Sequence, residues 1–395
     1  MSACSRRGAL AATTAFMVLA MLPLPAARAA DDVLNVLTWC DHEDPELLGP
    51  FEQANKVRVH FKDIDSTDAT RAILRQAQAA DWDVVIMEET AAPQLAEAGL
   101  LMPLDPADFP DNGTAPAIGD PATGSYGGRL YAVPEKYGFN AVAFNRARVS
   151  ATDMEDINAI WQPRYHGRIA IYDSYLPVLS YIALALGLDP ARLNTADLPA
   201  LQAKLATLRA SAPIVGDIAT VQQALADGQV DIVVGGGAWT TAGVGEGGTP
   251  AQAGSSPTDP RHPDLTFTVP RQGAMRWLHG ISIAAASQRK ALAVAFAQYL
   301  RTPAAQARLA TSSCYWGMPA STRAPLDEAT RAALHWDQQA AYLAASHPYP
   351  TPDDGMDARL RAVWDRVMRD DAPPPAAATD GTDSRDAGAK AATQP

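Results

Sequence analysis

The segment Arg276–Ile283, with the sequence RWLHGISI, places His279 two residues after Trp277 and just before a short apolar strand pattern. A histidine in this setting could be a core residue, a catalytic base, a metal ligand or one wall of a pocket, because imidazole exchanges protons near neutral pH. A second histidine, His42, follows Asp41, and imidazole with carboxylate suits first-row metals. The spacing contains no compact motif such as HExxH, so we do not expect a metal site.

No sequence pattern supports covalent or phosphoryl-transfer chemistry. The chain contains no GxSxG nucleophile motif, and the run Gly235–Gly237 lacks the GxGxxG spacing and a following Lys-Ser/Thr. This run is more simply a turn or a close approach of the backbone to a ligand. We therefore do not expect an enzyme or a cofactor, and a hydrolase is a distant alternative.

Strand-like and helix-like segments alternate in the first part of the chain, and they must position any site. Three apolar runs predict strands and two segments of helical periodicity lie between them, at 33–39, 46–54, 57–61, 68–80 and 83–87. This order predicts a parallel α/β sheet. Because ligands bind beyond the carboxyl ends of such strands, Trp39–His42 and Glu88–Thr90 are candidate site segments.

A second α/β set follows in the chain. Its predicted strands and helices are 168–172, 174–187, 195–210, 214–216, 220–227, 230–234, 265–269, 281–286 and 289–301. Two lobes, with the chain passing between them more than once, account for this order. The predicted division assigns 30–139 and about 266–312 to lobe 1, and 140–265 and about 313–371 to lobe 2.

The two ends of the chain predict processing and disorder rather than fold. Residues 1–29 contain a basic pair, an apolar run of signal-peptide length and the small-residue site Ala27–Ala29, so we expect cleavage near Ala29 and export to the periplasm. No later apolar run is long enough to cross a bilayer. The segment 372–395 is rich in Ala, Pro and Asp, which predicts a disordered tail.

The charge balance excludes some classes of partner. The chain carries 32 Lys+Arg and 44 Asp+Glu, a net charge of −12 at pH 7. This acidity argues against nucleic acid and against anionic membrane surfaces. The acidity weakly favours a protein that meets cationic solutes, and we expect a monomer.

Several segments resemble the periplasmic spermidine/putrescine-binding proteins of ABC transporters, over about 34–367. The segments that carry the resemblance are DWDVVI (81–86), AVPEKYGFNAVAFN (132–145), WQPRYHG (161–167), VPRQGAMRWLHGISI (269–283), FAQYLRTP (296–303) and YWGMP (315–319). The resemblance implies an α/β Venus-flytrap fold whose two lobes close over a solute by hinge bending. It also implies delivery of that solute to an inner-membrane ABC permease.

The resemblance further implies a site for a linear amine, with aromatic walls and carboxylates. Trp39 and Trp277 fall on two of the family's aromatic walls, and Tyr315 or Trp316 falls near a third. An ammonium over an aromatic face gains about 0.5–2 kcal/mol. Carboxylates neutralise its charge.

The family's acidic positions are changed in this chain. His279 stands where the family has an acid, and Ser174 and Pro177 stand where an acidic pair would fall. A family tryptophan is replaced by Gly236, with Trp239 three residues later. These changes leave the identity of the solute open.

Neighbouring residues suggest two alternative kinds of binding site, one anionic and one cationic. Four acids, Asp41, Glu88, Glu89 and Asp173, could restore an anionic pocket. Protonated His42 and His279 could instead receive an anionic group, such as the carboxylate of a zwitterionic amine. The alternatives are therefore a receptor for a zwitterionic or anionic solute, and a ligand-presenting sensor subunit that signals to a membrane partner.

Two cysteines, Cys40 and Cys314, would remain after signal cleavage, and each adjoins a predicted pocket aromatic. An oxidising compartment permits a bridge between them. The sequence leaves a disulfide and two separate thiols equally open.

Overall fold

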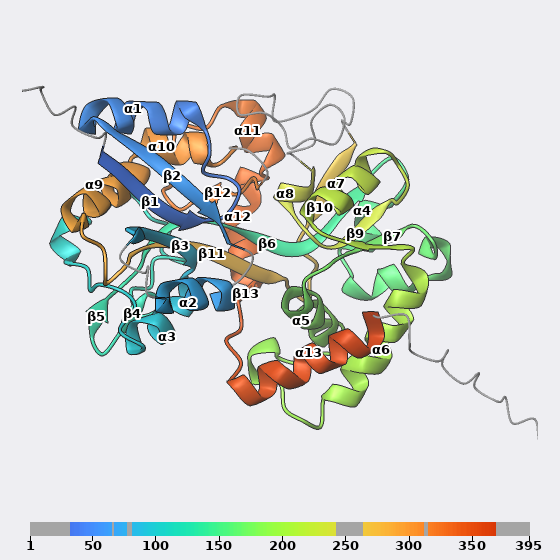
Figure 1. Ribbon diagram of the computed structural model, residues 1–395. Coiled ribbons are helices and arrows are strands. Elements are labelled where there is room, and N and C mark those ends of the chain that lie inside the picture. The colour runs from blue at the N-terminus through green and yellow to red at the C-terminus, as the bar shows by residue number, and fades with distance from the viewer. Residues whose placement is uncertain (1–31, 65–66, 77–80, 242–263, 312–314, 369–395) are drawn as a thin grey trace, which may run out of the picture.

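The protein consists of two α/β lobes, and the long strand β6 (Val133–Asn145) is one of several chain segments that connect them (Figure 1). The structure is a computed structural model, and it describes residues 32–64, 67–76, 81–241, 264–311 and 315–368. The predicted signal peptide at 1–29 and the predicted tail at 372–395 lie outside these residues.

Lobe 1 is built on a mostly parallel sheet. Its strands are β1 (Asp32–Thr38), β2 (Val57–Asp63), β3 (Val84–Glu88) and β11 (Met275–Ile283). Strand β1 runs parallel to both β2 and β3, whereas β11 is antiparallel to β3. The helices of this lobe are α1 (Pro45–Asn55), α2 (Thr67–Arg75), α3 (Ala92–Glu97), α9 (Lys290–Leu300) and α10 (Pro303–Leu309). The predicted β-α-β-α-β order is confirmed.

The start of α1 fixes the turn that leaves β1. The carboxylate of Asp44 accepts a hydrogen bond from the backbone N–H of Glu46 at 2.9 Å, and Pro45 occupies the first turn, where its missing N–H costs nothing. Arg308 of α10 also pairs with the buried Asp44. The cap and the ion pair together hold the segment that begins at Trp39.

Lobe 2 carries a second parallel sheet. Its strands are β7 (Ile169–Tyr172), β8 (Ile214–Gly216) and β9 (Ile232–Gly236), with β7 central and parallel to both neighbours. Its main helices are α5 (Tyr175–Ala185), α6 (Leu198–Ser211), α7 (Ile218–Ala226) and α13 (Asp354–Met368). No helix within the described part of the chain is long and apolar enough to cross a bilayer.

Strand β6 (Val133–Asn145) joins the two lobes. Its first part pairs with β11, and from Ala141 onward it pairs with β9 and with β10 (Leu265–Thr268). The sheet order is therefore β2-β1-β3-β11-β6-β9-β7-β8. The change of partners at Ala141 supports a lobe boundary there. In Figure 1, β6 runs horizontally between the lobes.

The last third of the chain is shared between the lobes. Strand β12 (Met318–Pro319) pairs with Tyr137 and Lys136 in the first part of β6, and β13 (His347–Pro348) pairs with the start of β11. Helix α13 packs against α5 and α6 of lobe 2. The sequence pattern predicts that the segment from about 313 to 371 belongs to lobe 2; within its described residues, 315–368, β12 and β13 pair with strands of lobe 1 and α13 packs on lobe 2.

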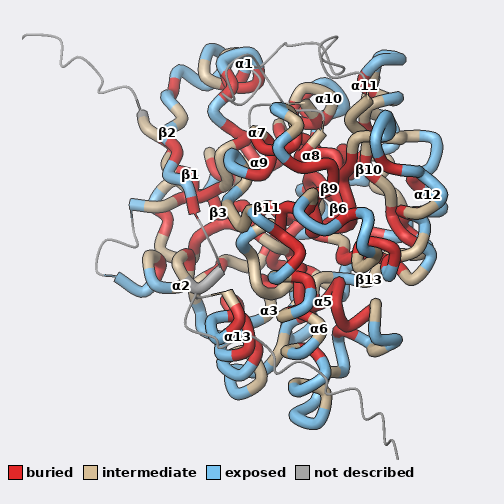
Figure 2. The backbone as a smooth tube through the Cα atoms, turned by 90° about the vertical axis from the view of Figure 1, so that its right-hand side faces the viewer, coloured by how far each residue is buried: buried red, intermediate tan, exposed pale blue. Residues whose placement is uncertain are grey.

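Each lobe has its own hydrophobic core, and a further core lies between them. This middle core contains Trp239, Trp277 and Trp316, all at most 1% exposed. Figure 2 shows that the buried backbone follows the central strands, while exposed backbone follows the outer helices. A large buried aromatic contributes roughly 3–5 kcal/mol relative to alanine, so these tryptophans anchor the junction of the lobes.

One predicted strand is corrected here, and one helix was missed. The strand expected at 281–286 begins instead at Met275, so RWLHGISI lies within β11. Alternation could not reveal this start, because β11 lies between β3 and β6 and is buried on both faces. Helix α13 was not predicted, although Leu360, Val363, Trp364 and Val367 form its buried stripe.

Candidate ligand-binding site

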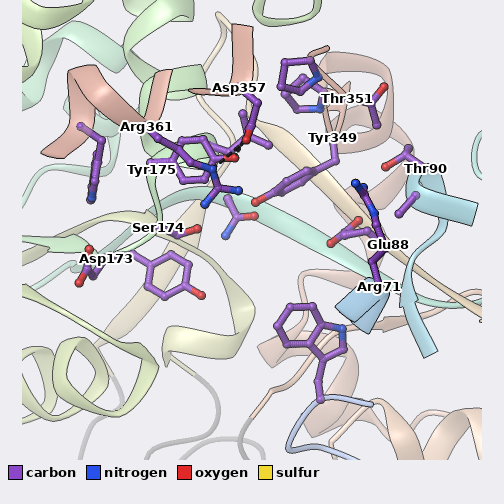
Figure 3. Close-up of a pocket in the computed structure, with 18 of the residues that line it drawn as sticks. Arg71, Glu88, Thr90, Asp173, Ser174, Tyr175, Tyr349, Thr351, Asp357 and Arg361 are labelled. Atoms are coloured by element: carbon purple, nitrogen blue, oxygen red, sulfur yellow. Dashed lines mark hydrogen bonds and ion pairs between the residues drawn. The ribbon is translucent and has the colours of Figure 1, made fainter. Parts of the chain in front are cut away.

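A cavity of about 490 Å³ lies between the two lobes, within the usual size range of small-molecule sites. Side chains from both lobes line it (Figure 3). In this view Glu88, Thr90 and Arg71 lie on one side of the Tyr349 ring, and Ser174 and Tyr175 on the other. The cavity lining also includes Trp39, Gln94, Asn140, Tyr172, Asp173, His279, Tyr315, Asp357 and Arg361.

Parallel strands deliver several of these side chains. Trp39 follows β1, Glu88 ends β3, and Tyr172 ends β7. Carboxyl ends of parallel strands in both lobes therefore face the same cavity, as the general rule for open α/β sheets predicts. This rule indicated Trp39 and Glu88 from the sequence alone. Applied to the strand that became β7, it would also have indicated Tyr172.

Aromatic rings form one continuous wall of the cavity. The rings of Trp39 and His279 are stacked, with centroids 5.6 Å apart and planes 7° apart. His279 in turn stacks on Tyr315 at 6.1 Å. Behind this wall, Trp239 stacks on Tyr315 at 5.5 Å, and Trp277 lies 4.7 Å from His279.

Glu88 supplies a carboxyl group at this wall. It is the cross-strand partner of His279 in the β3–β11 ladder, and it accepts a hydrogen bond from the backbone N–H of Leu278 at 3.2 Å. Burial raises the pKa of Glu88 to about 8, because the charged form loses its hydration and the Leu278 hydrogen bond only partly compensates. Without a ligand, Glu88 is therefore protonated at neutral pH.

His279 is a neutral residue in this structure. Burial lowers its pKa to about 3, since an imidazolium would lose its hydration there. Its Nδ1 has no hydrogen-bond partner within the described residues, although the residue is only 2% exposed. The lowered pKa disfavours the protonated His279 that the anion-binding alternative requires.

Asp41 and His42 lie outside the cavity, in a buried ionic network. The His42 imidazole bonds to Asp41 at 2.7 Å and to Glu135 at 3.1 Å, and Lys136 pairs with the second oxygen of Asp41. Burial lowers the pKa of His42, but the carboxylates of Asp41 and Glu135 outweigh it and raise the pKa to about 9.

The same network keeps Asp41 ionised. Burial would raise the pKa of Asp41, but Lys136 and His42 hold it far below its usual range. Asp41 is thus neutralised within the protein, because β6 carries Lys136 to it. No pattern in the sequence indicates this pairing, since 95 residues separate the two partners.

Four further predicted site residues also lie outside the cavity lining. Glu89 turns away from Glu88 into lobe 1, where burial and the Glu88 charge raise its pKa well above the usual value. Trp239, Trp277 and Trp316 are buried in the middle core. Gly138 and Gly317 make room for Trp277, since a Cβ on either would lie within 2.5 Å of its ring.

The other six predicted residues line the cavity. They are Trp39, Glu88, Asp173, Ser174, His279 and Tyr315. Asp173 is exposed at the mouth, whereas the Ser174 side chain hydrogen-bonds to Tyr349. Their roles in binding stay a prediction.

Sequence reasoning missed the outer half of the cavity. Arg71 comes from α2, and Asp357 and Arg361 come from α13, where they form an i,i+4 pair at 2.8 Å. Tyr349 comes from the segment between β13 and α13. A proline-flanked tyrosine before an amphipathic helix was the available signal for this segment.

Two further sequence hypotheses concern cysteines and metals. Cys40 is disulfide-bonded. Its predicted partner, Cys314, lies outside the described residues. Among the described residues, no group of three or more His, Cys, Asp or Glu side chains could hold a metal ion.

The family model for bacterial extracellular solute-binding proteins matches residues 46–336. The chain belongs to this family. A cavity between two α/β lobes is therefore the expected place for its solute, and the predicted fold class is confirmed.

This solute-binding protein is similar to proteins with different solutes. It is 25% identical to the putrescine/agmatine-binding protein of Pseudomonas aeruginosa, over 87% of this chain and 93% of that one. The spermidine/putrescine ABC transporter substrate-binding protein of Streptococcus pneumoniae has the same fold, with a TM-score of 0.67, 18% identity and coverage of 85% and 98%. The Atu4243-GABA receptor also shares it, with a TM-score of 0.64, 17% identity and coverage of 86% and 98%.

Proposed function

We propose that this protein is the periplasmic receptor of an ABC importer and captures a small organic amine between its lobes. The observation that carries the proposal is a protonatable carboxyl, Glu88, set in an aromatic cavity wall. Trp39 and Tyr315 provide ring faces for the cation, and Glu88 provides the opposite charge.

The physical argument rests on desolvation. A buried carboxylate without a partner is costly, so Glu88 holds its proton until a cation arrives. An ammonium placed beside it restores the charge pair and gains about 0.5–2 kcal/mol from each aromatic face. Lobe closure excludes water, which strengthens both interactions.

The cellular setting belongs to the same proposal. Residues 1–29 act as a cleaved signal peptide, and the mature chain is a monomer that carries out no catalytic step. It delivers its solute to an inner-membrane permease, and neither nucleic acid nor a cofactor takes part.

A zwitterionic amine is a second candidate ligand. The guanidinium groups of Arg71 and Arg361 line the same cavity as Glu88. Guanidinium binds carboxylates well because its N–H groups form a planar fork. A molecule with an ammonium at one end and a carboxylate at the other would match this distribution of charge.

A thermal-shift screen of the mature protein tests both candidates. A ligand at 100 times its Kd stabilises the folded state by about 2.7 kcal/mol, which is readily measured. We expect shifts with diamines or ω-amino acids and none with dicarboxylates. A shift with small acids alone would refute the amine proposal, and a shift abolished by a chelator would point to metal instead.

A further inference from the structure

We infer that Glu88 and His279 together bind and select a primary ammonium group. The carboxylate and the imidazole each accept a hydrogen bond from one of its N–H groups. This inference rests on the proposed function and deepens it, because it names the head group that the cavity accepts. It also predicts that amines without N–H donors are rejected.

The backbone register brings the two side chains together. Glu88 and His279 are directly paired residues of the antiparallel strands β3 and β11, so their side chains project to the same face of the sheet. Both line the cavity. The contact is therefore set by the sheet rather than by loop conformation.

Both side chains have unused hydrogen-bonding capacity. A carboxylate accepts about four hydrogen bonds, and within the described residues Glu88 accepts one, from the N–H of Leu278. The Nδ1 atom of His279 has no partner there, and neither does the indole N–H of Trp39, which stacks on His279. Buried polar atoms are usually satisfied, so these unpaired atoms indicate where a polar ligand group belongs.

The chemistry of the pair distinguishes primary from quaternary ammonium. A quaternary ammonium needs only aromatic faces, since it has no N–H to donate. A primary ammonium has three donors and no acceptor. It satisfies Glu88 and His279 at once, whereas a trimethylated head group would leave both unpaired and press methyl groups against them.

Capture of the ammonium also moves a proton. Free Glu88 holds a proton at neutral pH, and the bound cation stabilises the carboxylate instead. The O–H bond of Glu88 breaks, its electron pair remains on the carboxylate, and the proton passes to solvent. Binding should therefore be accompanied by net proton release.

Several titratable groups lie around Glu88, and their charges affect its protonation. They are His279 of β11, Glu89 of the turn after β3, Arg71 of α2, Tyr172 at the end of β7, and Tyr315, Tyr349 and Asp173. Burial keeps His279 neutral and raises the pKa values of the three tyrosines, so these four are uncharged near pH 7. Burial also raises the pKa of Glu89 well above its usual value, which favours its uncharged form. The guanidinium of Arg71 keeps its charge, as arginine does in proteins, so Glu88 is the group that changes its charge on binding.

Isothermal titration calorimetry with three probes tests the inference. The probes are putrescine, 4-aminobutyrate and 4-trimethylammoniobutyrate, each titrated at pH 6, 7 and 9 in two buffers of different ionisation enthalpy. With Glu88 at a pKa of about 8, we expect affinity for the primary amines to rise about 10-fold from pH 6 to 7 and about 10-fold more by pH 9. About 0.9 proton should be released per ligand at pH 7. The trimethyl probe should bind at least about 10-fold more weakly than 4-aminobutyrate.

Two matched variants test whether Glu88 is the source of the released proton. Glu88→Gln should abolish proton release and the pH slope, while Glu89→Gln, the adjacent buried acid outside the cavity, should retain both. Equal binding of 4-aminobutyrate and its trimethyl analogue, or primary-amine binding without proton release, overturns the inference and leaves the proposed function intact. If no probe binds at any pH, the proposed function itself fails.

Discussion

Substitution of His279 by aspartate should convert the site from one that favours a single ammonium to one that favours two. In an antiparallel ladder, directly paired residues have Cβ atoms about 4.5–5.5 Å apart. The His279→Asp substitution would therefore place a second carboxylate beside Glu88, the cross-strand partner of this position. At about 5.5 Å and an effective dielectric constant of about 20, two like charges repel by about 3 kcal/mol.

This repulsion should appear in ligand preference. In the unliganded variant the two carboxyl groups share a proton, because both cannot ionise at this separation. A diammonium neutralises both carboxylates, whereas a monoammonium neutralises only one and leaves either the shared proton or up to about 3 kcal/mol of repulsion in place. The ratio of affinities for putrescine over butylamine should therefore rise about 10- to 100-fold. Calorimetric titration of both amines into wild type and the His279→Asp variant measures this ratio.

The matched control is His279→Asn, which has the size of aspartate without its charge. It should leave the putrescine-to-butylamine ratio close to that of the wild type. Thermal denaturation of each variant confirms that it is folded. An unchanged ratio in a folded His279→Asp protein would mean that residue 279 does not face the ligand, and the reasoning from the β3–β11 register would be refuted.

Three further predictions concern the wall, the network and pH. Trp39→Leu removes one ring face, and the expected loss of about 0.5–2 kcal/mol corresponds to roughly 2- to 30-fold weaker amine binding by calorimetry. Lys136→Met removes one of the two cations that neutralise the buried Asp41 carboxylate and leaves His42 as the other, which should cost about 3–5 kcal/mol in urea denaturation. Arg331→Met, which breaks an exposed pair, should cost at most about 1 kcal/mol. The ligand-free protein should lose thermal stability between pH 5 and 8, because folded Glu88, with a pKa of about 8, retains a proton that the unfolded chain has already released. Glu88→Gln should flatten that loss; an equally steep loss in the variant would contradict the assignment.

The sequence predicted the fold well where a single physical rule decides it. Apolar runs separated by helical periodicity located β1, β2 and β3, and the rule for carboxyl ends of parallel strands pointed to Trp39 and Glu88. Strand β6 was not predicted as a strand. It is buried along nearly its whole length, so its sequence does not alternate between apolar and polar residues. It also carries Glu135 and Lys136, which are unusual in a buried strand.

The site was harder to predict because charge pairing depends on distant parts of the chain. Asp41 and Glu88 look alike in sequence, since each follows a strand at the expected edge. Lys136 and His42 neutralise Asp41 inside lobe 1. Among the described residues, Glu88 accepts a hydrogen bond from the Leu278 N–H, has no cationic partner in an ion pair, and lines the cavity. Only the folded arrangement of β6 and β11 distinguishes them. The outer wall from α13 was missed for the same reason, because its position depends on packing against α5 and α6.

The most direct test of the account is a crystal structure of the mature protein with the tightest-binding amine from the thermal-shift screen. The account predicts the ammonium nitrogen within about 2.7–3.2 Å of a Glu88 carboxylate oxygen and against the ring faces of Trp39 and Tyr315. A ligand bound with a carboxylate toward Glu88, or outside the cavity between the lobes, would contradict it.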